Sequence, residues 1–391
     1  MVISPIRWID DPAAQWAGKR VLCRLDLDVA VAPKGRVVDA AGVLRVVPTL
    51  RFLLRQGARV IVVGHRGDPK AKVRGHLSLL PVAECLQERL RHEIVFVHDC
   101  VGGGVRCLVN DLRDGRLLML ENTRFYRGEY TQHSEFVSAL AALADVYVND
   151  ALGCSHLAHA SLSAVPRSMS RRLGGLGLRQ DLQTLRRLRD DPPRPVVAIL
   201  GDGGENPVDL LRAAAGILPI VDTLCVGGRL AWNGKAASSP RLWRRAKAAG
   251  VTVELPRDCL VATGNPCKTK DGSAPRVVSW GEMTDDAPLL DIGPMTRERF
   301  GEVIAQAGTV LLLGGVGAWR QPQCADGTRS VVNSLTQGSR SCIVLGAEAA
   351  AACRALGRNH ASLHFVGGSL APLLWLGREE LPGLRVLTEQ I

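Results

Sequence analysis

The sequence predicts an α/β protein made of two doubly wound parallel-sheet domains that are joined by a helix. Three observations lead to this prediction. Short apolar segments alternate with helical ones along the chain, and several apolar segments end in Gly, His, Asn or Asp. The chain of 391 residues is also long enough for two hydrophobic cores.

The first half of the chain carries five strand-like segments. We expect strands at residues 20–27, 59–65, 93–98, 116–122 and 145–150. Helices are expected between them at residues 43–57, 79–91 and 134–144, where apolar residues recur at helical spacing. Strands that alternate with helices in this way favour a parallel sheet, and they predict a first domain over residues 1–175.

The second half repeats the alternation. Strands are expected at residues 196–201, 223–228, 251–255, 309–315, 341–347 and 362–368. Residues 176–195 precede them as a predicted helix that Pro192 and Pro193 end. We therefore expect an interdomain helix and linker over residues 176–194 and a second domain over residues 195–375.

Polar residues at the strand ends of the first half share one chemical character. They are Arg24, Asp26, Asp28, His65, Arg66, Asp68, Arg124, His156 and His159. Arginines and histidines interleaved with acids suit a small phosphorylated carboxylate. His156 and His159 are three residues apart and are expected to share a helix face, but no third ligand at a telling spacing supports a metal site.

The stretch VVAILGDGGENPVDLLRAA, residues 196–214, has the layout of a phosphate-binding turn. An apolar strand leads into Gly201, Gly203 and Gly204, and a helix follows, so backbone N–H groups can face an anion. The turn nevertheless contains no lysine or arginine before Arg212. Glycine-rich turns recur at residues 311–319, 344–352 and 366–371, and each alone is a weak signal.

Composition limits the other classes of function. The net charge of +11 leaves open an anion-binding or nucleic-acid-binding protein, but the sequence contains no recognisable nucleic-acid module. Eleven cysteines without CxxC pairs favour reduced thiols and a cytoplasmic protein. No apolar run reaches the ~18 residues that span a bilayer, so we expect no membrane partner.

Several longer motifs together resemble those of the phosphoglycerate kinase family over nearly the whole chain. In the first half, RLDLD (24–28) resembles RVDFN, and HRGDP (65–69) resembles HLGRP. LMLENTRFYRGE (118–129) resembles LLLENLRFYKGE, and NDALGCSHLAHAS (149–161) resembles NDAFGTAHRAHAS. In the second half, LDIGPMT (290–296) resembles LDIGPKT, and CADGTRSVVNSL (324–335) resembles FAKGTKAVAEAL.

The resemblance implies two Rossmann-like domains with a hinge helix between them. It implies that the N-terminal domain binds 3-phosphoglycerate and that the C-terminal domain binds ATP or ADP with Mg²⁺. It further implies a monomer whose C-terminal tail, residues 376–391, packs back on the N-terminal domain. The residues matched to nucleotide binding are Gly201, Gly203, Gly204, Gly314, Gly315, Gly317, Arg320, Gly346, Glu348 and Ala349.

The chain departs from the family pattern where charge matters most. The catalytic arginine of the family falls on Gly42, and the two lysines of its phosphate loop fall on Gly204 and Val208. On the substrate side, Asp28 replaces an asparagine and Asp68 replaces an arginine.

On the nucleotide side, WNGPMGVFE reads LLGGVGAWR, which puts Arg320 at the position of a ribose-binding acid. GGGDT reads LGAEA, so Ala349 replaces a threonine and Glu348 replaces the aspartate associated with the metal–nucleotide. Glu348 is thus the one candidate metal ligand, with shifted geometry.

These departures predict a phosphoglycerate kinase-like protein that has lost most or all phosphoryl-transfer activity and retains ligand binding. The alternative is an active phosphoglycerate kinase in which Arg45, Arg66 or Lys70 substitutes for a lost cation. An anion-binding or nucleic-acid-binding protein is the second alternative.

Overall fold

The computed structural model describes residues 5–33, 35–204, 206–232, 240–262, 275–283, 289–357 and 363–389. The chain forms two compact units. Unit 1 comprises Met1–Gln183 together with Glu380–Ile391, and unit 2 comprises Thr184–Glu379. Of the described helices, none combines the length and the apolar character needed to cross a bilayer.

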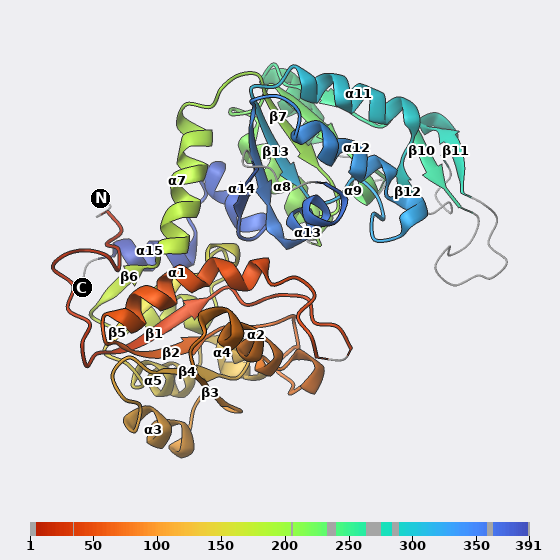
Figure 1. Cartoon of the computed structure of the whole chain (residues 1–391). Coiled ribbons are helices and arrows are strands. Elements are labelled where there is room, and N and C mark those ends of the chain that lie inside the picture. The colour runs from red at the N-terminus through yellow and green to blue at the C-terminus, as the bar shows by residue number, and fades with distance from the viewer. Residues whose placement is uncertain are drawn as a thin grey trace. The chain divides into compact units, whose positions relative to one another are not determined.

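Unit 1 is built on six parallel strands in the order β3-β4-β2-β1-β5-β6 (Figure 1). The strands are β1 (Arg20–Leu25), β2 (Arg59–Val63), β3 (Ile94–Val97), β4 (Leu117–Leu120), β5 (Val146–Asp150) and β6 (Arg172–Gly174). The helices are α1 (Ala41–Arg55), α2 (Leu80–Leu90), α3 (Gly103–Asn110), α4 (Arg127–Thr131), α5 (Ser134–Ala141), α6 (Ala164–Arg167) and α15 (Pro382–Thr388). The predicted parallel α/β fold is confirmed here.

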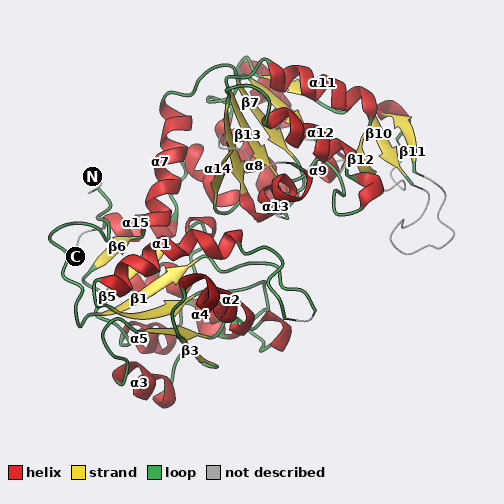
Figure 2. Cartoon of the chain, in the orientation of Figure 1, coloured by secondary structure: helices red, strands yellow, loops and turns green. Residues whose placement is uncertain are grey.

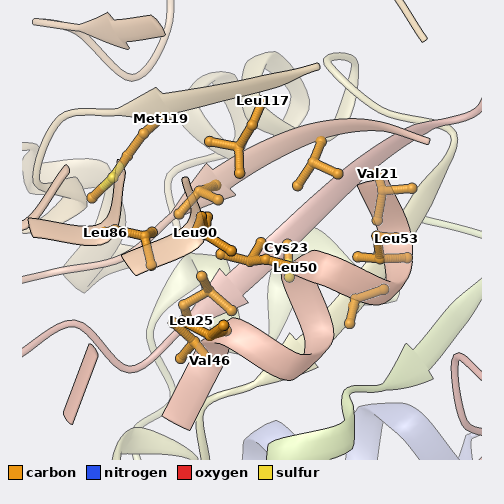
Figure 3. Close-up of a cluster of buried hydrophobic side chains, with 14 of the residues drawn as sticks. Val21, Cys23, Leu25, Val46, Leu50, Leu53, Leu86, Leu90, Leu117 and Met119 are labelled. Carbon is orange, nitrogen blue, oxygen red and sulfur yellow. The ribbon is translucent and has the colours of Figure 1, made fainter. Parts of the chain in front are cut away.

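The core of unit 1 explains why α1 and the central strands have their apolar pattern. On α1, Val43, Val46, Leu50 and Leu53 recur at helical spacing and are buried. Figure 3 shows side chains of α1 together with side chains of β1, β4 and α2 in one cluster. Because helices cover the parallel sheet, its strands are almost continuously apolar, and the buried Arg24 in β1 stands out as an exception.

Unit 2 repeats the plan with six parallel strands in the order β15-β14-β13-β7-β8-β9. The strands are β7 (Val196–Leu200), β8 (Thr223–Val226), β9 (Thr252–Glu254), β13 (Thr309–Leu313), β14 (Ser341–Leu345) and β15 (Leu363–Val366). The helices are α8 (Pro207–Ile217), α9 (Gly228–Trp232), α10 (Pro240–Ala248), α11 (Pro294–Ala305), α12 (Asp326–Leu335), α13 (Gly346–Leu356) and α14 (Leu370–Leu376).

A second, three-stranded sheet in unit 2 was not predicted from the sequence. Its strands β10 (Asp258–Val261), β11 (Arg276–Ser279) and β12 (Leu289–Ile292) are antiparallel, in the order β11-β10-β12 (Figure 2). Among the described residues, no α-helix separates these three strands, so they fall outside the strand–helix alternation on which the prediction was based.

The helix α7 (Leu176–Asp190) lies where the sequence predicts the linker helix, and it ends before Pro192. Its first turn is fixed in unit 1: the N–H of Leu176 donates to Thr49 Oγ1 (2.9 Å), and the N–H of Leu178 donates to Asp150 Oδ1 (2.5 Å). The C-terminal helix α15 also belongs to unit 1, where the Asn149 side chain donates to the Gly383 carbonyl (2.8 Å).

Both six-stranded sheets have a point where the strand order reverses. In unit 1 this point lies between β1 and β5, and in unit 2 it lies between β7 and β13. Ligands of open parallel sheets bind beyond the carboxyl ends of the strands at such points. The loops after these four strands contain most of the candidate residues, so topology supports one ligand site in each unit.

Candidate functional site

The centre of the unit 1 site is the guanidinium of Arg24, which is fully buried at the end of β1. Its Nε donates to Ser161 Oγ (3.0 Å), and its Nη1 donates to the Leu25 carbonyl. Ser161 in turn donates from Oγ (2.6 Å) and from its backbone N–H (3.0 Å) to the carboxylate of Glu129, which is also fully buried. Ser161 therefore links a buried cation to a buried anion.

The protonation state of His65 follows from the same contact. Arg24 Nη2 lies 2.7 Å from His65 Nδ1. Arginine only donates, so Nδ1 accepts and the proton of the neutral ring is on Nε2, 3.8 Å from Asp28 Oδ2. Burial lowers the pKa of His65 well below its usual value, and the charges of Arg24 and Arg124 lower it further. His65 is thus a neutral donor at pH 7.

Arg124 brings a second cation to this site from the turn after β4. Its Nη1 donates to the Gly67 carbonyl (2.8 Å), whereas its buried Nε has no hydrogen-bond partner among the described residues. The charges of Arg124 and Arg24 reach His159, where burial and these charges lower the pKa to about 4. Neutral His159 and cationic Arg124 leave donors for an anion.

His156 and His159 do not share a helix face, so that expectation is wrong. His156 lies in a turn after the 3-10 helix Leu152–Cys154, and His159 precedes the 3-10 helix Ala160–Leu162. The two imidazoles consequently come from different turns, and no metal pair arises from helical spacing.

Asp68 places an anion beside these donors. Its carboxylate accepts from Tyr130 Oη (2.7 Å) and pairs with Lys70 Nζ (2.9 Å). Burial alone would raise its pKa, but the hydrogen bonds from Lys70 and Tyr130 and the charge of Arg124 lower it overall. An ionised Asp68 opposes the binding of a phosphate dianion near Arg124.

Arg66 is buried and is used by the fold. Its Nη1 donates to the Ser78 carbonyl (2.6 Å), and its Nη2 donates to the His76 carbonyl. Asn122 holds the same loop, since its Nδ2 donates to the carbonyls of Arg66 (2.8 Å) and Leu77 (2.9 Å). The hydrogen bonds of the Arg66 guanidinium therefore stabilise the conformation of the loop after β2.

Arg45 is paired as well. It lies on α1 one turn beyond Gly42, and its Nη2 donates to the buried carboxylate of Asp181 on α7. Asp26 lies near enough for the charge of Arg45 to act on it, although burial and the charge of Asp28 raise the pKa of Asp26 overall. Arg45 thus forms an ion pair with Asp181 inside unit 1.

In unit 2, the loops after β7 and β13 approach each other so closely that only glycine fits. The N–H of Gly201 donates to the Leu313 carbonyl (2.8 Å), and that of Asp202 donates to the Gly315 carbonyl (2.7 Å). A Cβ on Gly201 would lie 2.2 Å from the Gly315 carbonyl oxygen, and Gly314 has a φ of +71°. These two residues are therefore explained by the backbone geometry of the loops.

The turn that leads into α8 carries no basic side chain at the matched positions. Gly204 has a φ of +78°, and a Cβ there would meet no atom within 4 Å. Asn206 caps the helix by accepting from the N–H of Val208 (2.9 Å), and Val208 is exposed. The predicted strand, glycine-rich turn and helix are thus present; Glu205 lies outside the described residues.

Arg320 and Glu348 form an ion pair across the loops after β13 and β14. Arg320 Nε lies 3.2 Å from Glu348 Oε1, and Arg320 Nη2 lies 2.5 Å from Oε2. The guanidinium also lies over the indole of Trp319, 4.5 Å from its ring centroid. Ala349 is fully buried, and Gly346 has a φ of +82° at the start of α13.

β12 contacts both the loop that carries Arg320, where the N–H of Ala318 donates to the Leu290 carbonyl (2.6 Å), and the start of α12 through Asp291. Asp291 Oδ1 accepts from the N–H of Ile292 (2.9 Å), and Oδ2 accepts from the N–H of Gly327 (2.6 Å). A Cβ on Gly317 would lie 2.1 Å from Oδ1, which explains the glycine. Burial raises the pKa of Asp291 to about 7 despite these hydrogen bonds.

The raised pKa of Asp291 predicts a pH-dependent stability of unit 2. The folded state binds the Asp291 proton more tightly than the unfolded chain, in which the pKa is about 4. The resulting stabilisation is complete below about pH 4 and is lost as the pH rises through about 7. We expect Asp291→Asn to flatten this decline in the free energy of unfolding, measured by urea denaturation across the range.

The control for this prediction is Glu298→Gln, which removes the same charge at an exposed carboxylate on α11. It should leave the slope of stability against pH unchanged. An equal slope in the wild type and in Asp291→Asn would show that Asp291 does not hold a proton in the folded state.

The profile of the family described as phosphoglycerate kinase matches residues 9–378 of the chain. This chain belongs to the phosphoglycerate kinase family. It is 35% identical over 402 residues to the phosphoglycerate kinase of Anaeromyxobacter dehalogenans strain 2CP-1, covering 98% of this chain and all of the relative. The phosphoglycerate kinase of Thermomicrobium roseum is 36% identical over 388 residues, covering 95% and 97% of the two chains.

Solved structures agree with the family assignment. The phosphoglycerate kinase of Coxiella burnetii is similar with a TM-score of 0.73 and 26% identity, covering 98% of this chain and 99% of its own. That of Pyrococcus horikoshii has a TM-score of 0.81 at 22% identity, with 98% of both chains covered, and supports the fold. The recognition of the family and the predicted fold class are both confirmed.

Sequence reasoning missed several residues that shape the unit 1 site of this phosphoglycerate kinase family member. Glu129 and Ser161 lie inside quoted motifs, but their pairing with Arg24 across the fold has no local signal. Tyr130 follows Glu129 directly and was not singled out, although it binds Asp68. Asp181 lies on α7 and reaches Arg45 from 136 residues away in the sequence.

Proposed function

We propose that this member of the phosphoglycerate kinase family binds the ligands of that reaction but transfers phosphoryl groups very slowly or not at all. The ligands are a 3-phosphoglycerate-like anion in unit 1 and ATP or ADP in unit 2. Phosphoryl transfer depends on positioning and on cations that neutralise the transferring group. The positions matched to those cations hold Gly42, Gly204 and Val208.

The observation that carries this proposal is that each candidate substitute cation is already engaged within its own unit. Arg45 pairs with Asp181, Arg66 donates to two carbonyls, and Lys70 pairs with Asp68. Recruiting Arg45 for catalysis would remove its hydrogen bond to the buried Asp181 carboxylate, and recruiting Arg66 would remove its bonds to two partly buried carbonyls, at about 1–3 kcal/mol. The two arginines are therefore costly to recruit as substitutes, whereas the exposed pair with Asp68 holds Lys70 only weakly.

The retained donors of unit 1 support continued ligand binding. Arg124 offers an unpartnered Nε among the described residues, and His65 offers Nε2–H. Asp28 and Asp68 lie in the same group of side chains and lower the affinity for a dianion. We therefore expect binding of 3-phosphoglycerate that is weak and that depends on Arg124.

The second candidate function is an active phosphoglycerate kinase. It is favoured by the full-length match to relatives named phosphoglycerate kinase, and by Arg45, whose charge acts on Asp26. Under this alternative Arg45 leaves Asp181 when ligands bind and replaces the missing arginine. The comparisons alone favour this alternative, whereas the paired state of the cations favours loss of transfer.

One experiment separates the two. The purified full chain is titrated calorimetrically with 3-phosphoglycerate, and the same sample is tested in a coupled kinase assay with ATP and Mg²⁺. We expect binding without turnover near the ~10 s⁻¹ of an ordinary metabolic enzyme. Arg124→Ala should weaken 3-phosphoglycerate binding about tenfold, because it removes a charge-assisted hydrogen bond.

The matched control is Arg127→Ala, which removes an exposed arginine from the neighbouring helix α4. It should leave the affinity unchanged. Turnover at an ordinary metabolic rate would reject the proposal and support the active kinase, and equal affinity in Arg124→Ala and wild type would remove the assignment of unit 1 as the ligand site.

A further inference from the structure

The carboxylate of Glu348 does not fit the role of a divalent-cation ligand that the family resemblance assigns to it. Both of its oxygens accept hydrogen bonds from the Arg320 guanidinium, at 3.2 and 2.5 Å. Mg²⁺ needs free carboxylate oxygens at short distances and in near-octahedral geometry. Within the described ranges, no group of three or more His, Cys, Asp or Glu side chains is placed to hold a metal ion.

Arg320 is positioned as a fixed cation. Its guanidinium lies 4.5 Å from the centroid of the Trp319 indole, and Trp319 is itself buried. Stacking on an aromatic face and a two-point hydrogen bond to Glu348 restrict the rotation of the guanidinium. The edge that carries Nη1 makes no hydrogen bond to a described residue, and the side chain is 53% exposed.

The loops around this cation lie at the edge of the unit 2 sheet where ligands of such folds bind. Arg320 follows β13 and Glu348 lies in the first turn of α13, directly after β14. The neighbouring loop after β7 contributes backbone at Gly203, whose carbonyl accepts from Ser369 Oγ (3.4 Å). These loops meet beside the reversal of strand order in the sheet of unit 2.

We propose that Arg320 supplies the positive charge that a divalent cation would otherwise supply at Glu348, so that unit 2 binds a nucleoside diphosphate without Mg²⁺. Glu348 then acts as a positioning residue that orients the guanidinium, and the free edge of Arg320 donates to a phosphate oxygen. A guanidinium binds phosphate through directed N–H groups and stays fully charged at every physiological pH. This inference rests on the proposed function only in that unit 2 retains nucleotide binding.

The test is a calorimetric titration of the full chain with ADP, once with Mg²⁺ and once with EDTA. We expect dissociation constants that agree within about twofold, because the charge belongs to the protein. Arg320→Glu should weaken ADP binding in EDTA by about tenfold or more, and Mg²⁺ should recover part of that loss. Arg276→Glu on the exposed strand β11 is the control with the same change of charge, and it should bind as the wild type does.

Loss of wild-type ADP binding in EDTA would overturn the proposal, as would the absence of ADP binding in both buffers. The comparison of the two buffers uses the wild-type protein, so it does not depend on the folding of any variant. ADP binding that appears only with Mg²⁺ overturns this inference alone, because unit 2 then still binds nucleotide as the proposed function states. Absence of ADP binding in both buffers contradicts the nucleotide binding in the proposed function as well, whereas turnover in the kinase assay contradicts only its loss of transfer.

Discussion

Arg24→Ala is expected to lower the free energy of unfolding of unit 1 by about 3–5 kcal/mol, the range measured when one partner of a buried ion pair is removed. Arg24 is fully buried and is linked through Ser161 to the equally buried Glu129. Without Arg24, the buried Glu129 carboxylate loses the cation to which Ser161 links it. It also removes the donor to His65 Nδ1.

Hydrogen exchange of the β1 amides is the suitable measurement, because it reports the opening of unit 1 alone. The matched control is Arg20→Ala, an arginine at the start of the same strand that pairs with Asp145 at 2.8 Å. That pair is partly exposed, with 30% and 38% of the two side chains accessible, so its loss should cost no more than about 1 kcal/mol.

A second variant tests the cause of the effect. Arg24→Ala combined with Glu129→Gln removes the orphaned charge, so it should recover part of the lost stability. If Arg24→Ala is no more destabilising than Arg20→Ala, the Arg24–Ser161–Glu129 link does not hold unit 1 together. In that case Arg24 returns to the group of candidate ligand-binding residues.

The fold was largely predictable from the sequence because parallel sheets leave a strong local signal. β1, β2, β4, β5, β7 and β13 are mostly apolar on both faces; β5 ends in Asp150, and a polar residue or a glycine directly follows each of the others. β6 and the sheet β10–β12 were missed, since β6 has a single large apolar side chain and no described α-helix separates β10, β11 and β12. Short strands depend on pairing partners that a local pattern does not reveal.

The site was predictable only in part, because the sequence shows which side chains are present and not which partners they choose. The sequence offers Arg66 as a candidate substitute cation, yet it donates to the carbonyls of residues 76 and 78. The sequence predicts that Arg320 and Glu348 each contact a nucleotide, yet in the structure they pair with each other. Such partnerships form across 10 to 136 residues of sequence and are decided by packing.

Restoring the missing cations should raise the rate of phosphoryl transfer more than any other change. A single transition-state arginine is worth roughly 10³ to 10⁵ in rate in phosphoryl-transfer enzymes. The variant combines Gly42→Arg, Gly204→Lys and Val208→Lys in the full chain. We expect its turnover in the coupled assay to exceed that of the wild type by about 10²-fold, below the full range because other departures remain.

Each substitution has a defined structural cost. A Cβ on Gly42 would lie 2.8 Å from a methyl group of Val29, so that side chain has to shift. Gly204 has room for a side chain, but its φ of +78° makes any other residue cost about 1 kcal/mol or more. Val208 is 56% exposed, so lysine fits there, although a cation near the start of α8 is disfavoured by about 0.3–1 kcal/mol.

The matched control replaces the same three residues with glutamine, which introduces similar bulk and backbone strain without charge. Equal rates in the charged and the glutamine variants would mean that the lost cations are not what limits transfer.

Adding Asp68→Arg to the charged variant then shows which unit limits the rate. Asp68 lies beside Arg124 in unit 1, so a gain that appears only with this fourth change locates the remaining defect in substrate binding rather than at the phosphate loop of unit 2.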